Sequence, residues 1–269
     1  MNQFYVITNK NKDKSYEITH QIKHYIESKG QTCVLATDDS NIPKGTDCIL
    51  VLGGDGTLIR AARELRSYDI PMLGINMGTL GYLTEADLQN LYECLEQLMY
   101  GETHVEKRMM LKGNVHQIED VALNDIVLTR SGSLRVIHFN VYVNGELLNT
   151  YHADGIVVST PTGSTAYNLS AGGPIVEPTA SMIVLTPICS HALNTSSIVL
   201  SAGDEIVLEV GEGRDGDIEE ASVSFDGEHD IPMKTGDRIV INKAQDVTKL
   251  LKLSKDSFLE ILRKKMKGN

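Results

Sequence analysis

The hydrophobic pattern of the chain changes near residue 105, and this change constrains the fold more than any other feature. Before it, uninterrupted apolar runs alternate with helical patterns, the runs at 4–8, 32–36, 48–53 and 71–76 and the helices at 14–28, 58–67 and 87–101. Continuous apolar strands separated by helices predict a parallel sheet covered on both faces. Beyond residue 105 the strands alternate polar and apolar residues, and Asn144-Gly145 predicts a tight hairpin. We therefore expect an α/β domain, a mostly antiparallel β domain and a short helix at 255–267.

Charge and cysteine usage limit the classes of partner and compartment. The 269 residues carry a formal net charge of -11 and contain no basic block except at 263–265. Nucleic acid is therefore not expected as a partner, because it requires a concentrated cationic face. The N-terminus has no signal-peptide core, and no apolar run reaches the roughly 18 residues of a membrane helix. A cytoplasmic protein without a membrane partner is expected, with reduced thiols at Cys33, Cys48, Cys94 and Cys189.

The apolar run at 48–53 ends in GGDGT at 53–57, where a predicted strand gives way to a predicted helix. Ligands bind at the carboxyl ends of parallel strands, and glycines let a phosphate approach the N–H groups of a helix N-terminus. The dinucleotide fingerprint does not match, because it requires a glycine where the chain has Ile59, and no P-loop sequence occurs. Asp55 fits a general base or a ligand of a metal ion carried by a phosphate donor. A helix cap explains Asp55 equally well.

A second polar segment, HADGIVVSTPTGSTAYNLSAGGP at 152–174, lies between two apolar runs. A connection of this length inside a compact domain is usually functional, although a polar surface loop is the alternative. Its hydroxyls and amides suit ribose and phosphate oxygens, and Tyr167 suits stacking on a base. Asn124-Asp125 beside an apolar strand suits a sugar diol or a carboxamide, and a turn explains that pair equally well.

Several segments, in this order, closely resemble the NAD kinases: GGDGT at 53–57, the Asn-acidic pair at 124–125, STPTGSTAYNLSAGGP at 159–174, LTPICSHAL at 185–193 and Asp226-Gly227. The resemblance covers essentially the whole chain. It implies an N-terminal Rossmann-like α/β domain at 1–103, a C-terminal all-β sandwich at 104–252, and an active site between them, so that the chain is α+β overall. The C-terminal helix in 253–269 is expected to pack back on one of the two domains, and the N-terminal domain is the candidate partner.

The resemblance also implies a reaction and a set of site residues. The family transfers a phosphoryl group from ATP, or in some bacterial members polyphosphate, to the adenosine-ribose 2′-hydroxyl of NAD and so makes NADP. Asp55 matches the catalytic base, and the phosphate loop contains Gly53, Gly54 and Thr57. The positions that match substrate contacts are Gly56, Arg60, Asn124, Asp125, Arg135, His152, Asp154, Thr165, Ala166, Tyr167, Asn168, Leu169 and Ser170. Asp125 stands where the family usually has Glu, so its shorter side chain must reach further or use water.

The expected cofactor is a divalent cation, Mg²⁺, that arrives with the phosphoryl donor, because the sequence offers no dedicated metal cage. The resemblance further implies a homodimer or homotetramer. Two alternatives stay open. A lipid kinase of the same superfamily shares GGDGT but needs an apolar groove, against which the polar stretch at 159–173 argues. A non-catalytic dinucleotide sensor would keep the binding segment without needing a base. The sequence does not decide between ATP and polyphosphate, or whether NADH is used.

Overall fold

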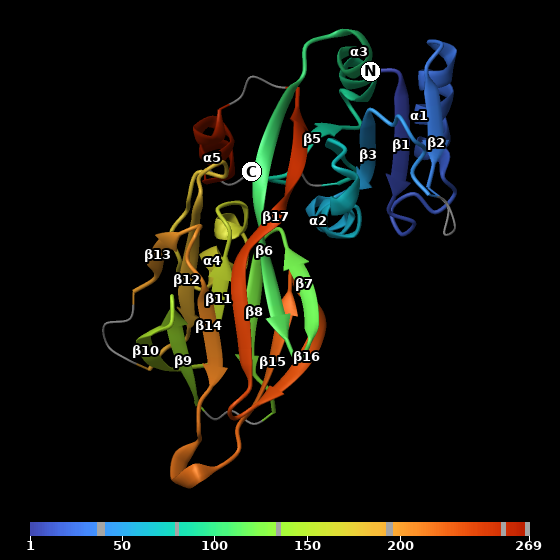
Figure 1. Ribbon diagram of the computed structural model, residues 1–269. Helices are drawn as coiled ribbons and strands as arrows, with labels where there is room; N and C mark the ends of the chain where they lie inside the picture. The colour runs from blue at the N-terminus through green and yellow to red at the C-terminus, as the bar shows by residue number, and fades with distance from the viewer. Residues whose placement is uncertain (37–40, 79–80, 133–135, 192–195, 254–256, 267–269) are drawn as a thin grey trace. The chain divides into compact units, whose positions relative to one another are not determined.

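The computed structural model describes residues 1–36, 41–78, 81–132, 136–191, 196–253 and 257–266 (Figure 1). The chain forms two compact units, unit 1 from Met1–Lys107 with Thr248–Asn269 and unit 2 from Arg108–Val247. Two strands, β6 (His104–Val115) and β17 (Arg238–Lys252), contribute residues to both units. The domain boundaries predicted after residues 103 and 252 lie at the start of β6 and at the end of β17.

Unit 1 contains a parallel sheet, as the uninterrupted apolar runs predict. Its strands lie in the order β2-β1-β3-β4, with bounds β1 (Gln3–Thr8), β2 (Thr32–Leu35), β3 (Cys48–Gly53) and β4 (Met72–Asn76). A short strand, β5 (Thr84–Asp87), pairs with β4, and the end of β17 pairs with β4 through Leu250 and Met72. Every residue of β3 and β4 is buried, which explains why these strands carry no charge.

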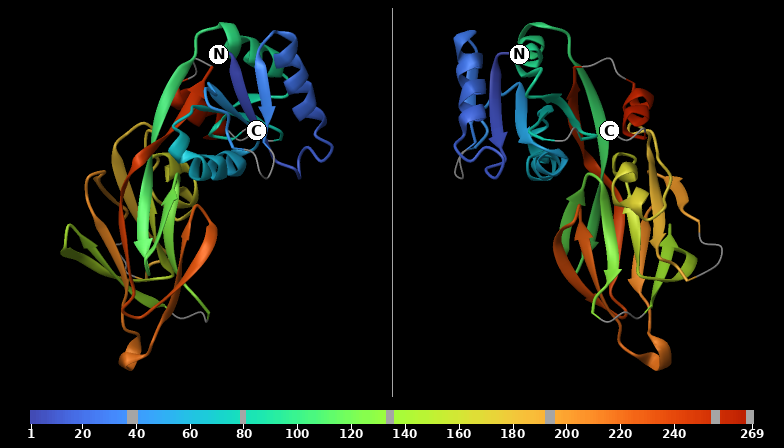
Figure 2. Two further views of the ribbon diagram at one scale, coloured as in Figure 1. Left: turned by 45° about the vertical axis from the view of Figure 1, so that its right-hand side comes forward. Right: turned by 180° about the vertical axis from the view of Figure 1, so that it is seen from behind.

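Helices cover both faces of this sheet. The alternation along the strands sends Leu50 and Leu52 into one apolar cluster with α1 (Glu17–Ser28) and α3 (Leu91–Tyr100). The neighbouring side chains of β3 point to the opposite face, where α2 (Asp55–Glu64) packs against β3 and β4. Figure 2 shows α1, α2 and α3 around the strands of unit 1. A doubly wound α/β arrangement follows, and the predicted fold class of the N-terminal region is confirmed.

Several local features of unit 1 differ from the prediction, and helix α1 begins at Glu17 rather than at 14. Strand β5 was not expected, because its sequence TEAD carries two charges and only its pairing with β4 makes it a strand. Helix α2 begins at Asp55 rather than at 58. Helix α3 begins at Leu91 rather than at 87, because the Asp87 carboxylate accepts the N–H groups of Gln89 and Asn90 at 2.8 and 3.1 Å and holds a turn there.

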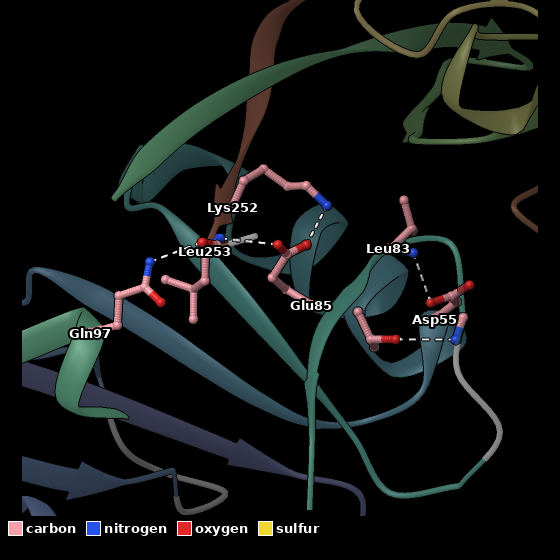
Figure 3. A network of polar contacts seen from close by, with 8 residues as sticks. Asp55, Leu83, Glu85, Gln97, Lys252 and Leu253 are labelled. Atoms are coloured by element: carbon pink, nitrogen blue, oxygen red, sulfur yellow. Dashed lines mark hydrogen bonds and ion pairs between the residues drawn. The ribbon is translucent and has the colours of Figure 1, made fainter. Parts of the chain in front are cut away.

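The end of β17 is held in unit 1 by a buried polar network (Figure 3). Lys252 forms an ion pair with Glu85 of β5, and the two side chains are 11% and 4% exposed. The N–H of Leu253 donates to Glu85 at 3.0 Å, and Gln97 of α3 donates to the Leu253 carbonyl at 2.9 Å. The last helix is α5 (Phe258–Met266), which agrees with the helix predicted at 255–267.

Unit 2 is a sandwich of two sheets. One sheet has the order β10-β9-β14-β17, extended by β6 and β7, with β7 (Ile118–Ala122), β9 (Ile137–Val143), β10 (Glu146–Ala153) and β14 (Ile206–Val210). The other has the order β13-β12-β11-β8-β15-β16, with β8 (Asp125–Arg130), β11 (Gly155–Ser159), β12 (Met182–Ile188), β13 (Ile198–Ser201), β15 (Glu220–Phe225) and β16 (Glu228–Lys234). Phe139 and Leu208 of the first sheet share one buried core with Val158 and Phe225 of the second. The predicted C-terminal all-β domain is therefore confirmed.

The hairpin predicted at Asn144-Gly145 joins β9 to β10. Both turn residues have positive φ, 51° and 82°, as a type I′ turn requires. In the part of the chain that the structure describes, no helix is long and apolar enough to cross a membrane.

Candidate functional site

Asp55 is the first residue of α2 and follows the carboxyl end of β3. Its Oδ2 accepts the N–H of Tyr82 at 2.7 Å. Its Oδ1 accepts the N–H of Leu83 at 3.1 Å (Figure 3). A β-carbon on Gly81 would lie 1.9 Å from Oδ1, so this close approach requires a glycine. The residue that caps α2 is Gly54, and among the described residues no side-chain cap hydrogen bond is made there, so the capping alternative for Asp55 is wrong.

The glycines around Asp55 have different surroundings. A β-carbon on Gly53 would lie 2.3 Å from the hydroxyl oxygen of Thr57, so residue 53 must be small for Thr57 to pack there. Thr57 is buried and accepts a hydrogen bond from the Asn9 amide at 3.0 Å. A β-carbon on Gly56 would meet no atom within 4 Å, and Gly56 is exposed. The first turn of α2 therefore leaves open space at the β-carbon position of Gly56.

Unit 2 contains a cavity of about 370 Å³ that brings together four of the predicted substrate-binding residues. The residues that line the cavity come from three places in the sequence: β8 with the residue before it, the segment after β11, and the end of β15 with the β15–β16 turn. The lining residues are Asn124, Asp125, Val127, Thr129, Ala166, Tyr167, Ser224, Asp226 and Gly227. Tyr167 is 44% exposed, so its ring is accessible at the rim. The cavity combines an amide, two carboxyl groups and one aromatic ring.

Asp226 organises this cavity, although it was not among the site residues predicted from the sequence. Its carboxylate accepts the backbone N–H groups of Leu123, Asn124 and Asp125 at 2.8, 2.7 and 3.1 Å. Its own N–H donates to the Asp125 carbonyl at 2.9 Å. The Asp226-Gly227 dipeptide was a visible turn signal, but only the pairing of β15 with β8 brings it to Asn124-Asp125. Asp226 therefore fixes the backbone of the predicted Asn-acidic pair.

Asp125 lies in an environment that disfavours its charge. The residue is 5% exposed and faces the Asp226 carboxylate. Burial, and then the negative charge of Asp226, raise the pKa of Asp125 to about 7. Near neutral pH, Asp125 is thus able both to accept a hydrogen bond and, in its protonated form, to donate one to a ligand.

The segment after β11 is built against Asn124. The N–H of Thr160 donates to the Asn124 carbonyl at 2.8 Å, and its hydroxyl donates to the Leu123 carbonyl at 2.6 Å. A β-carbon on Gly163 would lie 2.2 Å from the Asn124 carbonyl oxygen, so only glycine allows this contact. The segment continues as a 3₁₀ turn (Thr162–Thr165) and the one-turn helix α4 (Tyr167–Ser170). The segment therefore packs against the backbone that lines the cavity, and it is not the polar surface loop that was the alternative prediction for it.

Within that segment the predicted contact residues divide into two groups. Asn168 is fully buried, and its amide donates to the carbonyls of Ser164 and Pro174 and accepts from the Thr186 hydroxyl. Its side chain therefore holds the segment together. The other predicted contacts are at least partly accessible: Thr165, Ala166, Tyr167, Leu169 and Ser170.

The remaining predicted contacts do not line the 370 Å³ cavity. Asp154 forms an ion pair with Arg130 at 2.8 Å. Arg60 is exposed on α2 and lies 3.8 Å from Glu64. Arg135 lies outside the described residues.

His152 lies on β10 and lines a second cavity of unit 2, of about 560 Å³, together with His138 and Arg214. The rings of His152 and His138 are 4.3 Å apart. Burial lowers the pKa of His152, and the nearby His138 and His191 lower it further.

Among the described residues, no group of three or more His, Cys, Asp and Glu side chains could hold a metal ion. The oxygen ligands near the glycines of unit 1 are the Asp55 carboxylate and the amide of Asn76, the last residue of β4 and the partner of Gly53 in register. Asn76 is 2% exposed, and its Oδ1 has no hydrogen-bond partner in the described part of the chain. These oxygens suit a hard divalent cation that brings further ligands with it.

Comparisons with known proteins agree with this division of the chain. Residues 10–103 match the ATP-NAD kinase N-terminal domain, and residues 123–253 match the ATP-NAD kinase C-terminal domain. An NAD kinase of Agathobacter rectalis is 50% identical, with 100% of this chain and 99% of the relative covered. An NAD kinase of Lachnospira eligens is 46% identical, with 99% of this chain and 100% of the relative covered.

Two solved structures share the fold. The NAD kinase of Archaeoglobus fulgidus in complex with ATP has a TM-score of 0.81 at 25% identity and covers 98% of both chains. The yeast NADH kinase complexed with NADH has a TM-score of 0.81 at 23% identity and covers 100% of this chain and 88% of its own. The likeness to the yeast enzyme supports the fold alone. With two family domains and relatives at 46–50% identity over the full length, the chain belongs to the NAD kinase family.

Proposed function

We propose that unit 1 binds the phosphoryl donor beside Asp55, that unit 2 binds the dinucleotide, and that Asp55 is the general base. The chain is a phosphotransferase of the NAD kinase family. In the reaction, the adenosine-ribose 2′-oxygen of NAD attacks the terminal phosphorus of ATP. The bond from that phosphorus to the bridging oxygen breaks, ADP leaves, and the hydroxyl proton passes to the Asp55 carboxylate. NADP is the product.

The observation that carries the proposal is the setting of Asp55. Two backbone N–H groups hold its carboxylate in one orientation, and the residue is only half-buried. A base that is fixed before the substrate arrives loses little entropy in the reaction. The N-terminus of α2 and the glycine beside it favour donor phosphates at the same edge of the sheet.

The cavity of unit 2 supports the dinucleotide part of the proposal. Asn124 and Asp125 offer donors and acceptors suited to a ribose diol or a carboxamide. Tyr167 offers an exposed ring face for stacking on a base. Asp226 and the Ser159–Gly163 segment hold these groups in place through the backbone bonds described above.

A divalent cation, Mg²⁺, fits the residues present if it arrives with the donor phosphates. The Asp55 carboxylate and Asn76 Oδ1 would be its protein ligands, directly or through water. When bound, it would neutralise charge on the transferred phosphoryl group. Use of polyphosphate, a homodimer or homotetramer and a cytoplasmic location are further parts of the proposal that the family resemblance implies.

An NADP-formation assay tests this function. The purified chain is supplied with NAD or NADH, with ATP or polyphosphate, and with Mg²⁺ or EDTA, and a diacylglycerol arm tests the lipid-kinase alternative. We expect NADP from NAD with Mg-ATP and no product with EDTA. Phosphorylated lipid, or tight NAD binding without any product, would replace the proposal by the lipid kinase or the sensor. Neither alternative has support from the comparisons. Light scattering gives the oligomeric state.

A further inference from the structure

We infer that Lys12 binds the phosphates of the donor, an assignment that rests on the proposed function of the Asp55 site. Lys12 lies in the loop between β1 and α1, outside the glycine sequence at 53–57. Its ammonium group lies close to two glycines that follow neighbouring strands of the sheet. A β-carbon on Gly54 would lie 3.3 Å from the Lys12 Nζ, and one on Gly78 would lie 3.5 Å from it.

The backbone around Lys12 is held in position on both sides. Its N–H donates to the Asn9 carbonyl at 2.9 Å, and the Asn9 amide donates to Thr57 in the first turn of α2. The next residue, Asp13, is 5% exposed, and its carboxylate accepts both the N–H and the hydroxyl of Thr19 at 2.9 and 2.7 Å. The lysine therefore extends from an anchored turn rather than from a free loop.

The ammonium group of Lys12 has no partner among the residues that the structure describes. Within the described ranges, no carboxylate or carbonyl accepts a hydrogen bond from Nζ of Lys12, and no ion pair includes it. Lys12 is an exposed residue, but its ammonium group lies beside the backbone of Gly54 and Gly78 rather than away from the protein. An unpaired ammonium beside the backbone of two glycines is suited to a phosphate, which it attracts as a point charge.

A second, independent observation indicates a ligand at the same edge of the sheet. Asn76 ends β4, pairs with Gly53 in register, and donates from Nδ2 to the Gly78 carbonyl at 2.6 Å. Its Oδ1 is buried without a donor among the described residues, which is costly unless a bound group supplies one or a cation binds it. Gly78 therefore lies between the two groups: its carbonyl accepts the Asn76 amide N–H, and its β-carbon position is close to the Lys12 ammonium. A phosphate chain with its cation satisfies both groups.

Because a lysine recognises charge rather than a nucleoside, Lys12 suits the phosphates of ATP and of inorganic polyphosphate alike. The assignment thus concerns the donor and not NAD. Calorimetry on the full chain, with Mg-ATP, inorganic tripolyphosphate and NAD as separate probes, distinguishes the two donor sources from the acceptor.

The test compares Lys12→Met with Lys14→Met, the second removing an exposed lysine two residues away. We expect Lys12→Met to weaken Mg-ATP and tripolyphosphate binding about 10- to 100-fold, the range for a lost charge-assisted hydrogen bond. Its Kd for NAD should stay within about twofold of wild type, and Lys12→Arg should restore most of the donor affinity. The KM for ATP should rise in parallel, and Lys14→Met should match wild type throughout.

Unchanged tripolyphosphate and ATP binding in Lys12→Met would overturn the assignment, and so would an equal loss of NAD binding. Either result leaves the function of the family site intact if wild-type protein makes NADP. Conversely, if wild-type protein makes no NADP, the proposed function is wrong. The comparison of tripolyphosphate binding by wild type and Lys12→Met then still decides whether Lys12 binds a phosphate. Gly54→Ala provides a second variant, because its β-carbon would lie 3.3 Å from the Lys12 Nζ and shift the ammonium slightly, and it should weaken donor binding without affecting NAD.

Discussion

The two aspartates at the centre of the proposed sites lie in opposite environments. Asp55 of unit 1 is half-buried, and two backbone N–H groups hold its carboxylate. Asp125 of unit 2 is buried beside a second carboxylate, and no described residue donates a hydrogen bond to its side chain. The first arrangement orients a half-buried carboxylate, as the proposed general base requires, whereas the second creates a group that is easily protonated near pH 7. The same residue type thus suits the proposed proton transfer in one unit and the proposed ligand recognition in the other.

The largest expected effect comes from Asp55→Asn. The amide cannot take the 2′-hydroxyl proton, so kcat should fall about 10²- to 10⁴-fold, the usual contribution of a general base. The Kd for NAD should not change, because the cavity residues of unit 2 are untouched. Turnover at saturating NAD and ATP, together with NAD calorimetry, measures both quantities. Turnover close to that of wild type would remove Asp55 from its role.

Asp226→Ala should give the next largest effect, on stability rather than on chemistry. Three backbone N–H groups at 123–125 lose their acceptor, and we expect a loss of about 3 kcal/mol in the free energy of unfolding. Urea denaturation at pH 7 provides the measurement, with the exposed Asp230→Ala as the matched control, expected to stay within about 0.5 kcal/mol. If the two variants are equally stable, Asp226 does not organise the cavity.

Titration of Asp125 should make stability depend on pH. Its pKa is about 7 in the folded chain, against about 3.9 for an ordinary aspartate. Between these values the folded state binds the extra proton, so stability falls as the pH rises from about 4 to 7 and is level above that. Asp125→Asn should remove this slope and stabilise the chain at pH 8 on the order of 1–3 kcal/mol, with little change at pH 4.5. An equal effect at both pH values would contradict the raised pKa.

The smallest expected effect concerns Gly56→Ala, which separates stability from donor binding. Alanine favours the helix by up to about 1 kcal/mol, and its methyl group meets no atom within 4 Å. The melting temperature should therefore rise slightly, while the KM for ATP should rise severalfold if donor phosphates occupy the open space. A more stable variant with an unchanged KM for ATP would place the donor elsewhere.

Much of the local structure could be predicted from the sequence. The fully buried strands β3 and β4, the helices on either side, and the Asn144-Gly145 hairpin follow from periodicity and turn chemistry, which act over a few residues. Asp55 and the Asn124-Asp125 pair could be selected as candidates for the same reason, because each stands where a strand meets a polar turn. Strand β5 could not be predicted, because its short charged sequence becomes a strand only through pairing with β4.

The sequence by itself thus determined which segments become strands and helices, and which polar residues lie at their ends. Only the tertiary structure decided the surroundings of those residues. The pairing of β15 with β8 brings Asp226 to residues about one hundred positions earlier and raises the pKa of Asp125. The close approach of Gly81 to Asp55, the burial of Asn168 and the position of Lys12 over Gly54 are decided in the same way. The physical reason is that local patterns encode backbone conformation, whereas burial, charge and orphaned polar atoms depend on which distant segments pack together.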